Sequence, residues 1–358
     1  MLLKTSQESL KKIFQYVSKV PFAKSIIHSL SEAASGKSIV FFSLHQIINK
    51  NQNNFYVNPR AFDVEKLTKS LMEINRTIPF ISLSEAVDML KGEQKFVRSH
   101  GVLVLEVPYV KTLKILLPIL EKLSLPVCIM LSVNSISTGE FEWVEEIIYR
   151  FHSSNKMSFS VSYIDRSFPL FSVDERNVAA RNIIDHLIHC RPAILKQKLA
   201  EMRNALGDST VTISHDRVAT IAQLKELGEN PLVHFGAAGY FHWPFYEINP
   251  DEVDNEIITA KEKLSFLFGE AFIPVFYYPL GFEKKHNQDI VDKLIINGYE
   301  AAITHSLGIC HPGDNMFRLP CLPLDPTTKS FDQYQLMGLS DAIEEFLLVT
   351  LAQDKNLS

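Results

Sequence analysis

The chain has 358 residues, with 36 lysines and arginines against 41 aspartates and glutamates, a formal net charge of −5. This near-neutral balance excludes a strongly basic nucleic-acid-binding protein, so no nucleic-acid partner is expected. No apolar run approaches the roughly 18–20 residues that span a bilayer, and no secretory apolar region precedes a cleavage site, so a cytoplasmic protein is expected.

The four cysteines, at positions 128, 190, 310 and 321, are scattered without CxxC spacing. In a chain of this length they indicate reduced thiols rather than a disulfide framework. His186 and His189 lie next to Cys190 in the segment HLIHC. A metal site there lacks a fourth donor nearby, so a structural role is expected for these residues.

The first 36 residues combine apolar side chains at helical spacing with an excess of lysine over glutamate. One interpretation is a basic amphipathic helix on an anionic membrane surface, which would give peripheral contact with the inner face of a membrane. The other is a pair of short helices packed on the body of the fold. The sequence pattern leaves both open.

Apolar runs that read as strands alternate with amphipathic segments along the chain. The expected strands are 38–45, 102–106, 126–133, 231–236, 273–279, 300–304 and 317–324. The expected helices are 61–74, 82–90, a segment around Leu113–Leu120, 139–151, 216–228 and one that starts at Asn249. This alternation predicts a mostly parallel sheet with helical crossovers.

The alternation lapses between residues 155 and 207, where two successive helices are expected with no strand between them. The fold class predicted is α/β: a distorted (β/α)7-type barrel over 37–330, with an inserted helical hairpin at 155–207. Helices at 1–36 and 331–358 are expected to flank it.

Polar residues follow several of the predicted strands, and in a β/α barrel the carboxyl ends of the strands line the active site. The stretch HGVLVLEVPY shows this most clearly, because Glu106 follows a buried run and Pro108 ends the strand. The predicted strand ends carry His45, Glu106, Ser132, the Gly236–His242 loop, Tyr278 and His305.

Five segments of the chain occur in the order IVFFSLHQI, NPRAFDVEKLTKSLMEINRTIPFISLSEAVDMLKG, LPILEKLSLPVCIML, VFYYPLG and NGYEAAITHSLGICHPGDNMFRLPCLPL. Together they resemble the polysaccharide deacetylases of the NodB-homology superfamily, carbohydrate esterase family 4, in particular the bacterial branch associated with exopolysaccharide and O-antigen genes. The resemblance covers about residues 36–325 and is carried by many short matches in the same order. The resemblance implies hydrolysis of N-acetyl groups by a metal held by one aspartate and two histidines, with a second aspartate as base.

The implied residues match this sequence only in part. Glu106 falls at the position of the catalytic base, and Val107 at that of the aspartate ligand. Ala238 falls at the first histidine ligand, and only His242 retains a ligand position. Catalytic zinc sites normally have three protein ligands, so no metal cofactor is expected unless the chain has an alternative ligand set for zinc.

Two hypotheses follow. The first is a non-hydrolytic pseudoenzyme in bacterial surface-polysaccharide metabolism, whose partner is an N-acetylated glycan or another protein. Its contact residues would be His45, Tyr109, Tyr240, Trp243 and Tyr278. The second is a re-tooled hydrolase of N-acylated sugars, in which Glu106, His242 and His305 act as acid and base groups together with His45.

Overall fold

The computed structural model describes residues 37–48, 61–95, 97–207, 217–245, 248–280 and 288–324. The helices expected at 1–36 and 331–358 lie outside these residues. Within the described part of the chain, no helix combines the length and apolarity that a bilayer crossing requires.

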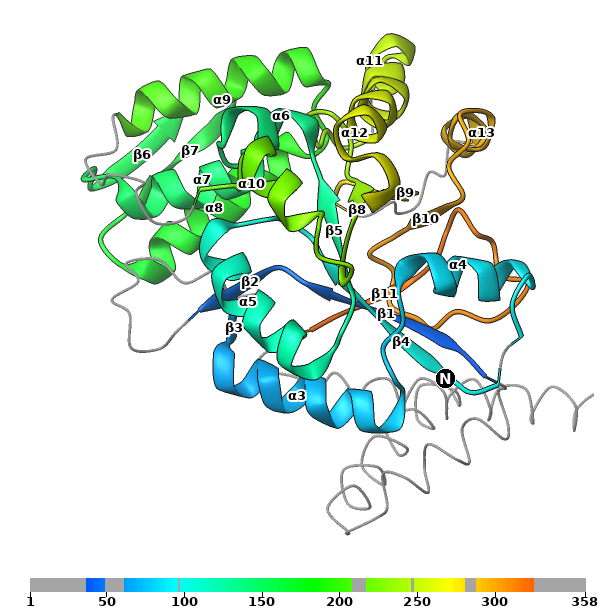
Figure 1. Cartoon of the computed structure of the whole chain (residues 1–358). Coiled ribbons are helices and arrows are strands. Elements are labelled where there is room, and N and C mark those ends of the chain that lie inside the picture. The colour runs from blue at the N-terminus through cyan, green and yellow to red at the C-terminus, as the bar shows by residue number, and fades with distance from the viewer. Residues whose placement is uncertain are drawn as a thin grey trace, which may run out of the picture.

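Seven parallel strands form the central sheet (Figure 1), in the order β10-β9-β8-β5-β4-β1-β11. A parallel bridge between Ile303, at the end of β10, and Leu319, just before β11, brings the two edges together. The sheet is therefore a nearly closed barrel, as the sequence predicted. Its strands are β1 (Ile39–Leu44), β4 (His100–Leu105), β5 (Val127–Leu131), β8 (Val233–Ala237), β9 (Phe272–Tyr277), β10 (Ala301–Ile303) and β11 (Cys321–Pro323).

Alternation along these strands separates two apolar clusters. Phe41 and Val104 belong to the inner cluster, on which helix α4 (Leu83–Lys91) packs. Phe42 and Leu105 belong to the outer cluster between the sheet and the other helices. Since successive side chains point to opposite faces, every second residue continues toward the interior up to the strand ends.

Helices cover the outside of the sheet (Figure 1) and contribute the apolar side of each amphipathic segment. Capping fixes several starts: Asp63 caps α3, and Asn249 caps the long helix predicted from that residue. The other elements around the sheet are β2 (Gln46–Ile48), β3 (Ala61–Asp63), α3 (Val64–Thr77), α5 (Val110–Leu123), α6 (Val133–Thr138), α7 (Trp143–Ser153), α10 (Ile221–Leu227), α11 (Pro250–Asp254), a π-helical turn (Asn255–Thr259), α12 (Ala260–Phe268), a short 3₁₀ turn (Gly269–Ala271) and α13 (Gln288–Ile296).

The segment at 155–207 contains more than the predicted helical hairpin. Two antiparallel strands, β6 (Ser158–Val161) and β7 (Ile164–Pro169), precede the helices α8 (Val173–Leu187) and α9 (Pro192–Leu206). The strands were missed because only a few alternating apolar residues, such as Phe159 and Phe168, mark so short a hairpin. Together with α7 these elements enclose an apolar cluster of their own and lie on one flank of the barrel (green in Figure 1).

Candidate functional site

The mouth of the barrel lies at the carboxyl ends of the strands. Along each strand every second side chain faces the barrel interior, and at the mouth the next residues in this inward-facing series are polar. Glu106 N–H donates to the Leu44 carbonyl at 2.9 Å, so the pairing of β1 and β4 continues beyond the strands. The register Leu44↔Leu105 then sets His45 beside Glu106. Both side chains are buried, at 4 % and 7 % exposure.

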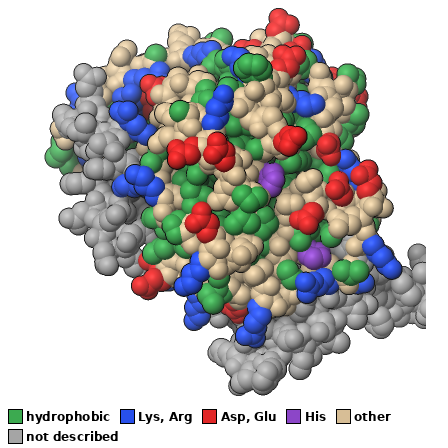
Figure 2. Space-filling view, in the orientation of Figure 1, with side chains coloured by type: hydrophobic (Ala, Val, Ile, Leu, Met, Phe, Trp, Pro, Cys, Tyr) green, Lys and Arg blue, Asp and Glu red, His purple; other side chains and the backbone are tan. Residues whose placement is uncertain are grey.

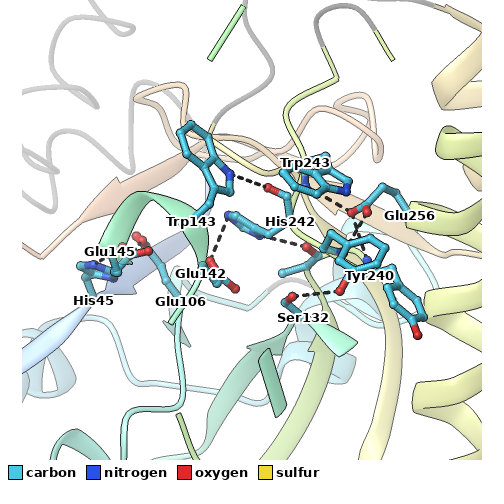
Figure 3. A network of polar contacts seen from close by, with 12 residues as sticks. His45, Glu106, Ser132, Glu142, Trp143, Glu145, Tyr240, His242, Trp243 and Glu256 are labelled. Carbon is cyan, nitrogen blue, oxygen red and sulfur yellow. Dashed lines mark hydrogen bonds and ion pairs between the residues drawn. The ribbon is translucent and has the colours of Figure 1, made fainter. Parts of the chain in front are cut away.

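His45 lies between two carboxylates (Figure 3). Its Nε2 is 3.0 Å from Glu145 Oε1, and its Nδ1 is 3.7 Å from Glu106 Oε2. Each ring nitrogen therefore faces an acidic oxygen, and the Nε2 contact with Glu145 is the one within hydrogen-bond distance.

His242 lies in the loop after β8 and faces a different glutamate (Figure 3). Its Nδ1 is 2.9 Å from the Ala238 carbonyl, which places the hydrogen on Nδ1, and its Nε2 is 3.5 Å from Glu142 Oε2. The loop is also fixed from outside, because Trp143 Nε1–H donates to the His242 carbonyl at 3.3 Å.

Glu142 and Glu145 both come from the beginning of α7, one at its N-cap and the other in its first turn. Glu142 is 6 % exposed and the Glu145 side chain 15 %. The start of α7 therefore lies over the strand ends and fills the mouth with two carboxyl groups, each next to a histidine.

The pKa values of these two glutamates move in opposite directions. Burial raises the pKa of Glu142 well above its ordinary value, and the nearby carboxylates of Glu145, Glu106 and Glu256 add to the rise. Burial also pushes the pKa of Glu145 upward, but the hydrogen bond and charge of His45 outweigh it and lower the pKa. Burial lowers the pKa of His242, which favours the neutral ring.

Glu256 holds the His242 loop from the π-helical turn between α11 and α12. Its carboxyl oxygens accept backbone N–H bonds from Phe241 at 2.8 Å, Tyr240 at 3.0 Å and Trp243 at 3.4 Å. The side chain is fully buried, and burial raises the pKa of Glu256 to about 8 against the opposing effect of these donors.

One position within this loop requires glycine. Gly239 has φ +90°, and a Cβ placed there would collide with Glu256 Oε2. His242 itself adopts φ +59°, which is uncommon for a residue with a side chain. The buried carboxyl group and the glycine thus determine a strained loop that directs His242 into the mouth.

The residues at the implied metal positions do not form a metal site. Val107 packs in the outer apolar cluster and Ala238 in the inner one. Over the residues that the structure describes, no group of three His, Cys, Asp or Glu side chains is arranged to hold a metal ion. Valine and alanine have no donor atom, so His242 is the one ligand side chain left at the three implied positions, and this set does not fit the metal of the deacetylase reaction.

His305, predicted as an acid or base group, and Tyr109, predicted as a contact residue, lie around the cluster and not in it. His305 follows β10 and packs on Tyr277, with ring centroids 4.9 Å apart. Tyr109 is buried against His45 and Phe141, at centroid distances of 6.0 and 5.9 Å.

The other aromatic residues differ in their access to the mouth. Tyr278 is fully buried in the outer cluster and donates its hydroxyl to the Phe317 carbonyl at 3.2 Å, so its position does not support contact with a ligand. Trp243 is 7 % exposed and packs with the 155–207 segment, whereas Tyr240 and Phe241 are half-buried.

The sequence reasoning missed Glu142, Glu145 and Glu256. Acidic residues at a helix start are common because they complement the helix dipole, so the first two carried no distinctive signal. Glu256 did carry a distinctive signal, since an acidic residue lies there between the apolar positions Val253 and Ala260 on the side of the helix that faces the core.

The fold and this mouth place the chain in the class of nearly closed β/α barrels with seven parallel strands. No family profile and no curated protein sequence matches the chain. Among solved structures it is similar to the Streptococcus pyogenes deacetylase PplD in complex with acetate, with TM-score 0.54 and 13 % identity over 84 % of this chain and 98 % of that one.

Two further structures are similar to a comparable degree. IcaB from Ammonifex degensii gives TM-score 0.55 and 13 % identity over 85 % of this chain and 98 % of that one. A polysaccharide deacetylase from Bacillus cereus gives 0.51 and 10 % over 86 % and 69 %. The chain therefore has the fold of the polysaccharide deacetylases, and the predicted resemblance is confirmed at the level of fold.

Proposed function

We propose that this protein binds a carbohydrate without hydrolysing it. The observation that carries the proposal is the filled mouth: Glu106 and His242, the two retained site residues, are buried and faced by His45 and Glu142. A general base must reach the water that it activates, and a metal must be present to polarise the acyl oxygen. The arrangement of the mouth favours neither access of a water molecule to Glu106 nor the binding of a metal.

Tyr240 and Phe241 are proposed as the carbohydrate-binding surface. Their rings are half-buried, with centroids 4.6 Å apart, and the backbone of both residues is held by Glu256. Aromatic faces that are fixed in position lose little entropy when a pyranose ring stacks on them. The similarity to a polysaccharide deacetylase from Bacillus cereus supports a carbohydrate as the ligand class.

Titration calorimetry with oligosaccharides of N-acetylglucosamine tests this proposal. The wild type is expected to bind saturably, and Phe241→Ala to weaken binding about tenfold, or roughly 1.4 kcal/mol. Phe266→Ala is the matched control, because Phe266 is 88 % exposed on α12 and is not part of the surface. Absence of binding by the wild type, or equal loss in both variants, would refute the proposal.

A re-tooled hydrolase is the second candidate, and the opposite pKa directions of Glu142 and Glu145 favour it. Two carboxyl groups in environments that drive their pKa values apart are the usual arrangement of an acid and a base. Acetate release from the same oligosaccharides, abolished by Glu106→Gln and retained in chelator, would favour this candidate over the first.

We also propose a cellular context. A role in bacterial surface-polysaccharide metabolism follows from the resemblance alone, and a protein partner is the alternative to a glycan. A cytoplasmic location, with residues 1–36 on the inner membrane face, stays an expectation. On the face in Figure 2, acidic and basic side chains are interspersed.

A further inference from the structure

Two lysines from different parts of the chain lie over the aromatic residues of the His242 loop. Lys263, on α12, has its Nζ 4.7 Å from the centre of the Tyr240 ring and donates to the Tyr240 hydroxyl at 2.9 Å. Lys196, on α9, has its Nζ 4.8 Å from the centre of the Phe241 ring and 5.5 Å from that of the Trp243 ring. The loop therefore receives one cation from the barrel and another from the 155–207 segment.

The three aromatic side chains under these lysines form a continuous row. The ring centroids of Tyr240 and Phe241 are 4.6 Å apart, and those of Phe241 and Trp243 are 5.6 Å apart. Lys263 lies over the first ring of the row, and Lys196 lies over the second and third. The two positive charges are thus placed at separate points along the surface proposed for the carbohydrate.

The protein leaves both ammonium groups available to a ligand. Both lysines are exposed, and neither forms an ion pair with an acidic side chain in the part of the chain that the structure describes. Glu256 binds the backbone of the same loop, but it is fully buried and burial raises its pKa to about 8, so it adds little negative charge at neutral pH. An ammonium has three N–H donors, and Lys263 uses one of them on Tyr240.

A glycan with carboxylates on its sugar units fits this surface. Its pyranose rings can stack on the aromatic faces, and its carboxylates accept hydrogen bonds from the ammonium groups. Exposed lysine side chains change rotamer within nanoseconds, so each can leave a ring face to a sugar and still reach a carboxylate beside it. Two cations over different rings suit charges that repeat along a glycan better than a single charged group.

We propose that the ligand of this surface is an acidic glycan with carboxylate-bearing sugar units, and that Lys196 and Lys263 determine this specificity. The inference rests on the proposed function, because it assigns a charge to the carbohydrate that Tyr240 and Phe241 bind. A lysine is a compact point charge, so each is expected to serve one carboxylate. Ion pairs at exposed positions add a few-fold each to the affinity and weaken as the salt concentration rises.

Titration calorimetry of the full chain with two tetrasaccharides tests this inference. Hyaluronan tetrasaccharide alternates N-acetylglucosamine with glucuronate, whereas chitotetraose is neutral. The wild type is expected to bind the acidic tetrasaccharide about tenfold more tightly, and this preference should fall as salt is added. Lys196→Met combined with Lys263→Met should bring the ratio of the two affinities close to one. Lys196→Arg combined with Lys263→Arg should keep the preference, because both cations remain.

The matched control is Lys66→Met combined with Lys69→Met, which removes two exposed lysines from α3 and changes the net charge equally. It should keep the wild-type preference, and circular dichroism shows whether each variant is folded. Equal binding of the two tetrasaccharides by the wild type would overturn this inference and leave carbohydrate binding standing, whereas no binding of either would overturn both. A preference that persists without Lys196 and Lys263, or that is lost equally in the control, would overturn the assigned role of the two lysines.

Discussion

The mouth contains two pairs of a histidine and a glutamate, and the pairs differ in how their charges are arranged. Glu145 is 3.0 Å from His45, whose second ring nitrogen faces Glu106, so one imidazole serves two carboxylates. Glu142 is 3.5 Å from His242, whose other nitrogen already bonds the Ala238 carbonyl. The lowered pKa of Glu145 favours its charged form beside His45, whereas the raised pKa of Glu142 and the lowered pKa of His242 favour a neutral pair.

This difference teaches that the neighbours of a carboxyl group, more than its position in the sequence, set its charge. Glu142 and Glu145 are three residues apart at the start of one helix, and both are shielded from water. One accepts a hydrogen bond from an imidazole, and the other is surrounded by further carboxylates. The four predictions below test that contrast, beginning with the largest expected effect.

Glu256→Ala should remove the hydrogen bonds that hold the His242 loop and leave the His45 pair intact. Three backbone N–H groups would lose their buried acceptor, so we expect a loss of roughly 3–5 kcal/mol in the free energy of unfolding. Urea unfolding followed by tryptophan fluorescence measures it. Glu262→Ala, at an exposed position of the adjoining helix, is the control and should change little; equal losses would contradict the role of Glu256.

Glu145→Gln should weaken the His45 side by about 2 kcal/mol at pH 7, since it replaces the charged acceptor of a buried imidazole. The pKa of Glu145 is lowered from its ordinary value of 4.5, so its stabilising contribution is present above that pH and is lost as the pH falls through the folded value. Urea unfolding at several pH values should show the wild type and the variant converging in acid. A constant difference would argue against a charged Glu145.

Glu142→Gln should have the opposite sign and stabilise the fold by about 1 kcal/mol at pH 7 or above. Because the pKa of Glu142 is raised, the wild type is most stable below the ordinary value of 4.5 and loses stability as the pH rises toward the folded value. The amide cannot ionise, so the advantage of the variant should grow with pH. A loss of stability like that of Glu145→Gln would remove the contrast between the two pairs.

His242→Asn should give the smallest effect. The difference between the free energies of unfolding at pH 5 and pH 7 should change by less than about 1 kcal/mol. The pKa of His242 is lowered below 6.5, so its contribution is present above that pH and falls as the pH drops through the folded value. Asparagine tolerates the positive φ and can still donate to Ala238. If the free energy of unfolding of the variant changes with pH between 5 and 7 as it does in the wild type, His242 does not titrate in this range.

The sequence predicted the barrel and grouped His45, Glu106 and His242 at its carboxyl-terminal end. For His45 and Glu106 this was possible because alternation along a strand persists to its end, so their inward position follows from the pattern. His242 lies in the loop after β8, and its direction depends on Gly239 and Glu256. The partners Glu142, Glu145 and Glu256 could not be predicted in the same way. They come from helices whose placement over the mouth depends on tertiary packing, and His305, although at a strand end, packs on Tyr277.

The π-helical turn at Asn255–Thr259 has a consequence for how the length of this segment can vary. Glu256 and Ile257 are consecutive and both fully buried, whereas a regular α-helix turns adjacent side chains about 100° apart. The wider turn directs one residue to the loop and the other to the core. Among related sequences we therefore expect Glu256 and the extra residue of the π-helical turn to be gained or lost together. A one-residue gap at this turn should then mark chains in which the His242 loop is not held by a buried glutamate.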